Sequence, residues 1–146
     1  MNSFLFNGIG YVYSPYMKPG ETPVQPIQGS KVHGCIIIYD EFIEGLKDLD
    51  GFSHLIILSF LHKTAFPTLQ VTPNQDAVSR GVFASRAPER PNPIGISIVK
   101  LIEAKGNTLI IEEFDLIDGT PVLDIKPFIP DIDHRENVTV GRDFKK

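Results

Sequence analysis

Three arginines lie within eleven residues of one another in a chain whose net charge is -4. Arg80, Arg86 and Arg90 belong to residues 80–95, and three prolines stiffen the same segment. A planar guanidinium makes paired, charge-assisted hydrogen bonds with carboxylates and phosphates, and a stiff loop loses little entropy when a ligand binds. The segment therefore predicts a site for an anionic group. The alternative is a proline-locked turn whose arginines pair with acidic side chains elsewhere.

A second candidate site is the tight turn Asp118-Gly119-Thr120-Pro121, within residues 115–127. Glycine adopts positive φ without steric cost, so this turn can expose backbone N–H and C=O groups. Such groups could hold a nucleoside. The alternative is an ordinary turn that joins two strands.

Common nucleotide-binding motifs are missing. Gly8 and Gly10 begin like a dinucleotide fingerprint, but Tyr13 stands at the third glycine position and Ser14-Pro15 follow where a helix should open. A phosphate there would lack the helix N-terminus that binds it. No P-loop pattern occurs in the sequence either.

Metal sites are not expected. The histidines, at positions 33, 54, 62 and 134, have no compact metal-binding spacing, and the one cysteine excludes a thiolate cluster or an internal disulfide. Cys35 lies within an apolar strand, which predicts a buried structural thiol. Asp131, Asp133 and His134 lack the glycine and the acidic ladder of a calcium loop.

The length of 146 residues and the hydrophobic share of 42% predict one packed domain over residues 1–146, with its core in residues 5–130. The acidic balance excludes an extended surface for phosphates but leaves room for a local basic patch. The sequence shows no secretion signal and no apolar run long enough to span a bilayer. We therefore expect a soluble, cytoplasmic protein.

The elements that must position these residues are short, because Gly and Pro together make up 24 of the 146 residues. Apolar runs predict strands at residues 9–13, 32–39, 53–61, 94–103, 108–114 and 122–125, with a hairpin turn at 104–107. Three consecutive isoleucines suggest that 32–39 is buried on both faces. Residues 62–80 read as a long irregular segment.

One helix is expected over residues 40–49, with Asp40 capping its first turn. Phe42, Ile43 and Leu46 recur at helical spacing on one side of it. Short strands with one short helix predict a mostly β fold: a small, closed or partly closed, mainly antiparallel β-barrel.

Together with Ser14-Pro15-Tyr16 and the pair of segments 51–54 and 60–62, residues 80–95 and 115–127 resemble the TrmO family. This family, formerly called YaeB or TsaA-like, comprises S-adenosylmethionine-dependent tRNA methyltransferases. The four motifs occur in the family's order and extend over residues 9–130. Glu89 stands where the family commonly has a hydrophobic residue.

The resemblance implies a non-Rossmann barrel that forms a homodimer, with an S-adenosylmethionine site near the subunit interface. It implies a tRNA substrate, methylated on N6 of the threonylcarbamoyladenosine next to the anticodon. Matched position by position, the cofactor-binding residues are Ser14, Pro15, Tyr16, Leu61, His62, Arg86, Ile96, Leu116, Ile117, Asp118, Gly119 and Thr120.

Methyl transfer to a weakly nucleophilic nitrogen is helped by a proton acceptor, for which His62 is the first candidate and Asp118 the second. Arg86 is expected to bind either the cofactor carboxylate or a tRNA phosphate. Contacts with RNA are expected from Arg80, Arg90, Lys126 and Lys63. Two alternatives remain: a non-catalytic module that senses S-adenosylmethionine or another nucleoside, and a methyltransferase for another RNA or a small metabolite.

Overall fold

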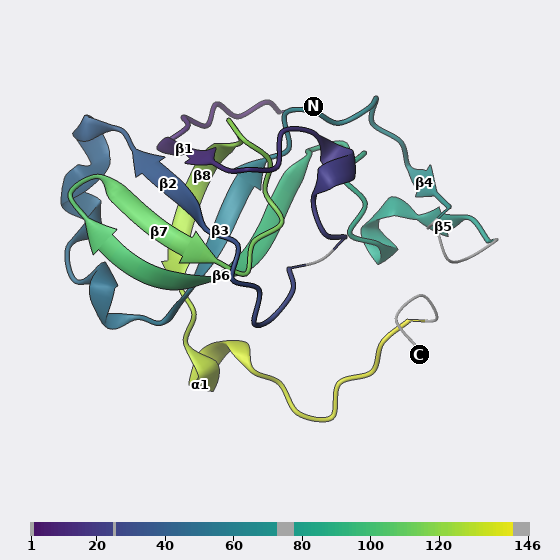
Figure 1. The fold of residues 1–146 in the computed structure, drawn as a ribbon. Helices are drawn as coiled ribbons and strands as arrows, with labels where there is room; N and C mark the ends of the chain where they lie inside the picture. Colours follow the sequence, from purple (N-terminus) through teal and green to yellow (C-terminus); the bar gives the residue numbers. More distant parts are fainter. Residues whose placement is uncertain (1, 25, 73–77, 142–146) are drawn as a thin grey trace.

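The structure is a computed structural model that describes residues 2–24, 26–72 and 78–141. In this part of the chain, six antiparallel strands close into a barrel (Figure 1). Around the barrel the order is β1 (Gly10–Tyr13), β2 (Gly34–Ile38), β7 (Thr108–Glu112), β6 (Ile94–Lys105), β3 (His54–Phe60) and β8 (Pro121–Pro127). The prediction of a small, mainly antiparallel barrel is confirmed.

The barrel core follows from alternation along each strand, since successive side chains point to opposite faces of a sheet. In β3, Leu55 and Ile57 are fully buried while their neighbours are only half-buried. The core also contains Val12, Ile36, Ile38, Val99, Leu109, Ile111 and Val122, each at most 2% exposed. The expectation that β2 is buried on both faces is wrong, because Cys35 and Ile37 point outward and are only half-buried.

The single helix expected over residues 40–49 is two 3-10 helices, Asp40–Leu46 (η2) and Leu49–Gly51 (η3). Asp48 separates them with a left-handed backbone at φ 66°. Phe42 and Leu46 pack against the core as expected, whereas Ile43, the third residue of the expected apolar side, is not among the residues packed against it. Asp40 lies inside the first turn and makes no capping hydrogen bond, which corrects its expected role.

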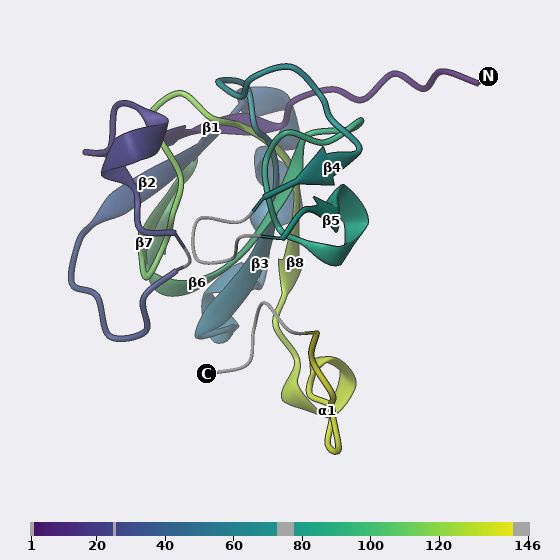
Figure 2. The ribbon, with the colours of Figure 1, turned by 90° about the vertical axis from the view of Figure 1, so that its right-hand side faces the viewer.

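Smaller elements surround the barrel. The segment expected to be irregular contains the paired strands β4 (Gln70–Val71) and β5 (Arg80–Gly81). Two short 3-10 helices are η1 (Pro19–Glu21) and η4 (Val82–Ala84). Helix α1 (Pro130–Asp133) follows β8 in the proline-rich tail and lies to one side of the barrel (Figure 2).

The two ends of the barrel differ in polarity. At one end β1, β7 and β3 finish and β2, β6 and β8 begin. The buried hydroxyl side chains gather at this end of their strands: Ser14, Ser59, Ser97 and Thr120, each at most 5% exposed. The polar groups within the apolar barrel therefore mark one end of it as the place for a site.

Gly10 allows β1 to lie close to β2. A Cβ at Gly10 would lie 2.1 Å from the carbonyl oxygen of Ile37, whereas a Cβ at Gly45 would meet nothing within 4 Å. We expect Gly10→Ala to lower the free energy of unfolding by at least about 1–3 kcal/mol, the cost of overpacking. Gly45→Ala, the control, should change it little. Urea unfolding measures both, and equal effects would contradict the close approach.

Candidate functional site

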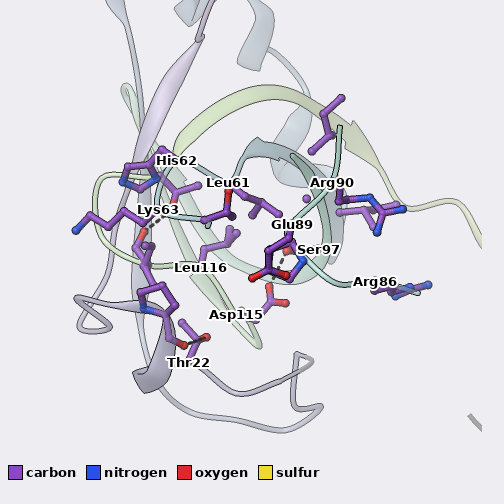
Figure 3. A pocket seen from close by; sticks show the side chains of 18 of the residues that line it. Thr22, Leu61, His62, Lys63, Arg86, Glu89, Arg90, Ser97, Asp115 and Leu116 are labelled. Carbon is purple, nitrogen blue, oxygen red and sulfur yellow. Dashed lines mark hydrogen bonds between the residues drawn. The ribbon is translucent and has the colours of Figure 1, made fainter. Parts of the chain in front are cut away.

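A cavity of about 510 Å³ opens at the polar end of the barrel (Figure 3). Its walls come from the segment after β3, the start of β6, the segment after β7, and two loops. The lining residues are Pro19, Thr22, Pro23, Val24, Leu61, His62, Lys63, Thr64, Ser85, Arg86, Pro88, Glu89, Arg90, Ile94, Gly95, Ile96, Ser97, Asp115, Leu116, Ile117 and Thr120. This size suits a nucleoside-containing ligand, because small-molecule pockets measure roughly 300–1,000 Å³.

The arginine segment and the Asp-Gly turn, which are far apart in sequence, therefore share one cavity. Of the residues expected to bind the cofactor, seven line it: Leu61, His62, Arg86, Ile96, Leu116, Ile117 and Thr120. The remaining five, Ser14, Pro15, Tyr16, Asp118 and Gly119, lie beside the cavity and are not part of its lining.

The N-terminal motif holds the turn in place. The Ser14 N–H donates to Asp118 Oδ1 at 3.0 Å, and the Asp118 N–H donates to the Tyr16 carbonyl at 2.7 Å. Gly119 donates its N–H to the Val12 carbonyl at 2.7 Å. Together these bonds form a clasp between the end of β1 and residues 116–120. The clasp shapes the cavity wall from behind.

Gly119 has the positive φ expected of this turn, 78°. A Cβ at Gly119 would lie 3.8 Å from His62 Nε2, so the turn and His62 are neighbours. His62 follows the end of β3, rather than lying on that strand with His54. Burial, and secondarily the charge of Lys63, lower the pKa of His62 below its ordinary value. The imidazole is therefore neutral at neutral pH.

The His62 Nδ1 atom is buried and has no hydrogen-bond partner within the described residues. A buried polar atom without a partner costs free energy unless a ligand or water satisfies it. His62 belongs to the cavity wall, so an unsatisfied polar atom lies next to the cavity.

Sequence reasoning missed Asp115, although it begins the motif that contains the turn. The Ser97 hydroxyl, itself 3% exposed, donates to Asp115 Oδ1 at 2.7 Å. Burial raises the pKa of Asp115 above its ordinary value, while the Ser97 hydrogen bond and the Arg86 charge oppose the rise. The signal that could have identified Asp115 is its position, because a carboxylate directly follows the apolar strand predicted at residues 108–114.

The basic side chains differ in how far they are free to contact a ligand, because some already have partners within the protein. Arg90 Nη1 donates to the carbonyls of Ser85 and Ala87, both at 2.9 Å, so this guanidinium braces its own loop. Arg86 is exposed at the rim and extends outward (Figure 3). Lys63 Nζ donates to the Met17 carbonyl at 3.3 Å. Arg80 and Lys126 lie outside the cavity lining, and Lys126 pairs with Asp124 at 3.0 Å.

Over residues 11–134 the chain matches the family of tRNA-methyltransferase O N-terminal domains. The chain belongs to the TrmO family. The resemblance read from the sequence motifs is therefore confirmed, and the cavity lies where those motifs meet.

Proteins with different names match this chain in sequence or in structure. A probable S-adenosyl-L-methionine-binding protein of Pyrococcus abyssi is 47% identical over 93% of this chain and 74% of its own length. A tRNA (adenine(37)-N6)-methyltransferase of Mus musculus is 36% identical over 99% of this chain and 35% of its own length. The crystal structure of TrmO from Pseudomonas aeruginosa superposes with a TM-score of 0.82 and 34% identity, covering 96% of this chain and 62% of that one.

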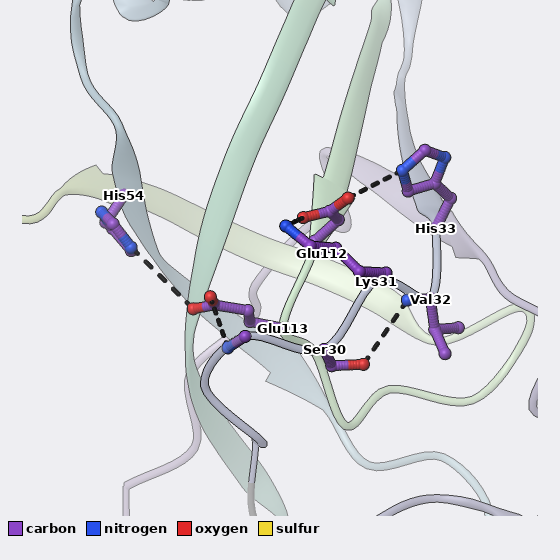
Figure 4. A network of polar contacts seen from close by, with 8 residues as sticks. Ser30, Lys31, Val32, His33, His54, Glu112 and Glu113 are labelled. Atoms are coloured by element: carbon purple, nitrogen blue, oxygen red, sulfur yellow. Dashed lines mark hydrogen bonds and ion pairs between the residues drawn. The ribbon is translucent and has the colours of Figure 1, made fainter.

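The stretch from Gly29 to His33 in this TrmO-family chain contacts two glutamates at the end of β7 (Figure 4). Glu113, at φ 59°, accepts the Gly29 N–H at 2.8 Å. Glu112 Oε1 lies 2.8 Å from His33 Nε2. Glu112 ends β7 and Glu113 follows it, two residues before Asp115, so the segment that leads into the cavity wall also binds the loop before β2.

Within the described ranges, no group of three or more His, Cys, Asp or Glu side chains is placed to hold a metal ion. None of the helices formed by these residues has the length and apolar character needed to cross a membrane.

The raised pKa of Asp115 gives a test of its role. The folded protein holds this proton more tightly than the unfolded chain does, so ionisation at neutral pH destabilises the fold. We expect Asp115→Asn to leave the free energy of unfolding at pH 7 unchanged or higher. The gain should shrink as the pH falls and vanish below about 3, under the ordinary Asp pKa of about 3.9, where the wild-type carboxyl is protonated in both states. Urea unfolding across this range checks it, with the exposed Asp131→Asn as control; a large loss of stability at pH 7 would contradict it.

Proposed function

We propose that this protein is an S-adenosylmethionine-dependent tRNA methyltransferase. Its substrate is N6 of the threonylcarbamoyladenosine next to the anticodon. The observation that carries the proposal is the single cavity on which the arginine segment, the segment after β3 and the Asp-Gly turn converge. The name of the mouse relative supports an adenine N6 acceptor in tRNA, and the name of the archaeal relative supports the methyl donor.

The residues present fit S-adenosylmethionine. Leu61, Ile96, Leu116 and Ile117 offer apolar surface for an adenosyl group. The half-buried Asp115 carboxylate and the His62 side chain, with its unpartnered Nδ1, offer polar groups in the wall of the same cavity. When bound, the cofactor supplies the methyl group on a positively charged sulfur. The chain's own task is to hold the acceptor nitrogen in line and to exclude water, and such positioning supplies most of the rate.

A proton leaves N6 when the N–CH₃ bond forms and the S–CH₃ bond breaks. His62 is placed to accept it, because its imidazole is neutral and lies in the cavity wall. Asp118 is the weaker candidate, since its Oδ1 accepts the Ser14 N–H and its side chain lies outside the lining.

Contacts with tRNA would come from the rim of the cavity. Arg86 and Lys63 are exposed there and are placed for phosphates or for the carboxylate of the modified nucleoside. Arg80 would extend this surface, whereas Lys126 lies toward the other end of the barrel, where it pairs with Ile56 across the sheet, and is poorly placed to do so. Arg90 would contribute by stabilising the conformation of residues 85–90, because its Nη1 already donates hydrogen bonds to two carbonyls there.

Transfer to tRNA is the direct test. We expect purified protein with labelled S-adenosylmethionine and bulk tRNA to place the label in a modified adenosine. Digestion to nucleosides followed by chromatography identifies the product. His62→Gln should slow turnover at saturating cofactor, roughly in the 10²–10⁴-fold range of a lost proton acceptor.

Other outcomes identify the alternatives. Tight cofactor binding with no transfer to any RNA would contradict the proposal and favour a sensor. Label in an unmodified adenosine, another RNA or a small metabolite would change the acceptor. Full turnover of His62→Gln would remove His62 from the chemistry.

We also propose that two copies associate beside the cavity. On the outside of the barrel, Ile94, Ile96 and Ile98 face the same way as the paired Phe60, Leu58 and Ile56. Ile94 and Ile96 are 46% and 51% exposed and also line the cavity. Contiguous exposed apolar surface of this kind marks an association site, and here it is continuous with the cavity rim.

Ile98→Glu tests this association, because it places a charge in the middle of the apolar face. We expect the variant to sediment as a monomer under conditions where the wild type is a dimer. Ile132→Glu, a similarly exposed position on α1, is the matched control and should stay dimeric. A monomeric wild type, or an unchanged Ile98→Glu dimer, would contradict the arrangement.

A further inference from the structure

The charges around the cavity are not evenly distributed. The exposed cations Lys63 and Arg86 stand at its rim, and Figure 3 shows the guanidinium groups of Arg86 and Arg90 pointing outward. The carboxyl groups of Glu89 and Asp115 face the middle of the cavity in the same view, and both residues line it. His62 adds no positive charge there, because burial keeps it neutral. The inner wall of the cavity is therefore anionic.

Asp115 is the most constrained of these groups. It follows β7 by three residues, and the chain between is directed across the barrel end by the left-handed Glu113. The buried Ser97 hydroxyl on β6 fixes one carboxyl oxygen at 2.7 Å. A carboxylate accepts about four hydrogen bonds, and here the Ser97 hydroxyl and the backbone of Asp115 itself act on it, which leaves acceptor capacity unused. No ion pair satisfies Asp115 within the described residues, although Arg86 is near enough for its charge to act on it.

Asp115 is half-buried and held rigidly, and partial loss of water from a carboxylate without a cationic partner costs free energy unless a ligand compensates for it. The cofactor in the proposed function carries two positive groups, the sulfonium and the α-ammonium, and one carboxylate. It is therefore a net cation. Its positive groups complement the inner wall, and its carboxylate complements the cationic rim.

We propose that Asp115, positioned by Ser97, is the anionic subsite that binds a positively charged group of S-adenosylmethionine. This inference rests on the proposed function, because it assigns a residue to the same cavity. Ser97 acts as a positioning residue that keeps one oxygen occupied and the other directed at the ligand. Glu89, a departure from the hydrophobic residue common in the family, adds negative charge to the same wall.

Calorimetric titration of the full chain with three probes tests the assignment. S-adenosylmethionine carries both positive groups, S-adenosylhomocysteine keeps only the ammonium, and 5′-methylthioadenosine carries neither. We expect Asp115→Asn to weaken S-adenosylmethionine about ten- to hundredfold, the loss expected for a charge-assisted hydrogen bond. Binding of 5′-methylthioadenosine should not change. An equal loss for S-adenosylhomocysteine assigns the ammonium, and a loss confined to S-adenosylmethionine assigns the sulfonium.

Two more variants separate charge from structure. Ser97→Ala keeps the carboxylate but removes its hydrogen bond, so we expect a smaller loss of affinity for the charged probes. Asp131→Asn on α1 should bind all three probes as the wild type does. Thermal unfolding of each variant shows whether it is folded, and should Asp115→Asn fail to fold, Ser97→Ala with unchanged affinity for every probe would overturn the assignment.

Each contrary result has a distinct meaning. Asp115→Asn that binds S-adenosylmethionine like the wild type, or loses all three probes equally, overturns the subsite and leaves the proposed function standing. Unchanged binding with lost turnover would make Asp115 a proton acceptor instead, and also overturns the subsite. A wild type that binds no S-adenosylmethionine contradicts both proposals. Asp115-dependent binding without methyl transfer supports the subsite and refutes the transferase.

Discussion

The clasp between the end of β1 and residues 116–120 holds the barrel and its site together. β1 pairs with β8 at only two positions, Gly10 with Val122 and Tyr11 with Pro121, so this seam is short compared with the seven-residue pairing of β3 and β6. Beyond it, backbone bonds from Gly119 to Val12 and from Val12 to Thr120 extend the closure. The Asp118 carboxylate also accepts a hydrogen bond from the Ser14 N–H. Each buried donor and acceptor that the clasp satisfies would otherwise destabilise the fold. The turn that closes the barrel is also the turn that borders the cavity, so stability and ligand binding share one set of contacts.

The N-terminal motif supports the turn beside the cavity. Ser14, Pro15 and Tyr16 match a cofactor-contacting motif, yet they lie outside the cavity lining and act on Asp118. Tyr16 also packs its ring 5.6 Å from that of Phe114, the residue before Asp115. The motif therefore connects both sides of the turn to the core. A sequence motif records that residues act at a site, but it does not distinguish a ligand contact from a residue that shapes the wall behind the ligand.

The strands could be predicted because alternation and Gly/Pro punctuation are local signals. Leu55 and Ile57 on β3, and the hairpin at Gly106, required no knowledge of distant residues. The 3-10 geometry of η2 was not predictable in this way, because the apolar spacing of Phe42 and Leu46 also fits an α-helix. The candidate site was found only in part. His62 and Thr120 belonged to recognisable motifs, whereas the pairing of Ser97 with Asp115 joins residues 18 positions apart through the barrel register. A contact of that kind forms only when the barrel closes, so no repeating pattern of residues in the sequence indicates it.

In the proposed function, the charge state of each residue determines whether it suits cofactor binding or proton transfer. A carboxylate on the inner wall attracts a cationic cofactor, but the same attraction favours the positively charged reactant over the transition state, in which the sulfur loses its charge. Asp115 should therefore serve affinity and orientation rather than speed. A neutral imidazole has no such conflict, since it accepts a proton only as the charge moves from sulfur to nitrogen. The lowered pKa of His62 keeps it in that form without repelling the cofactor. In the proposed function, Asp115 would bind the cofactor and His62 would accept the proton, and each group's environment matches the charge state that its role requires.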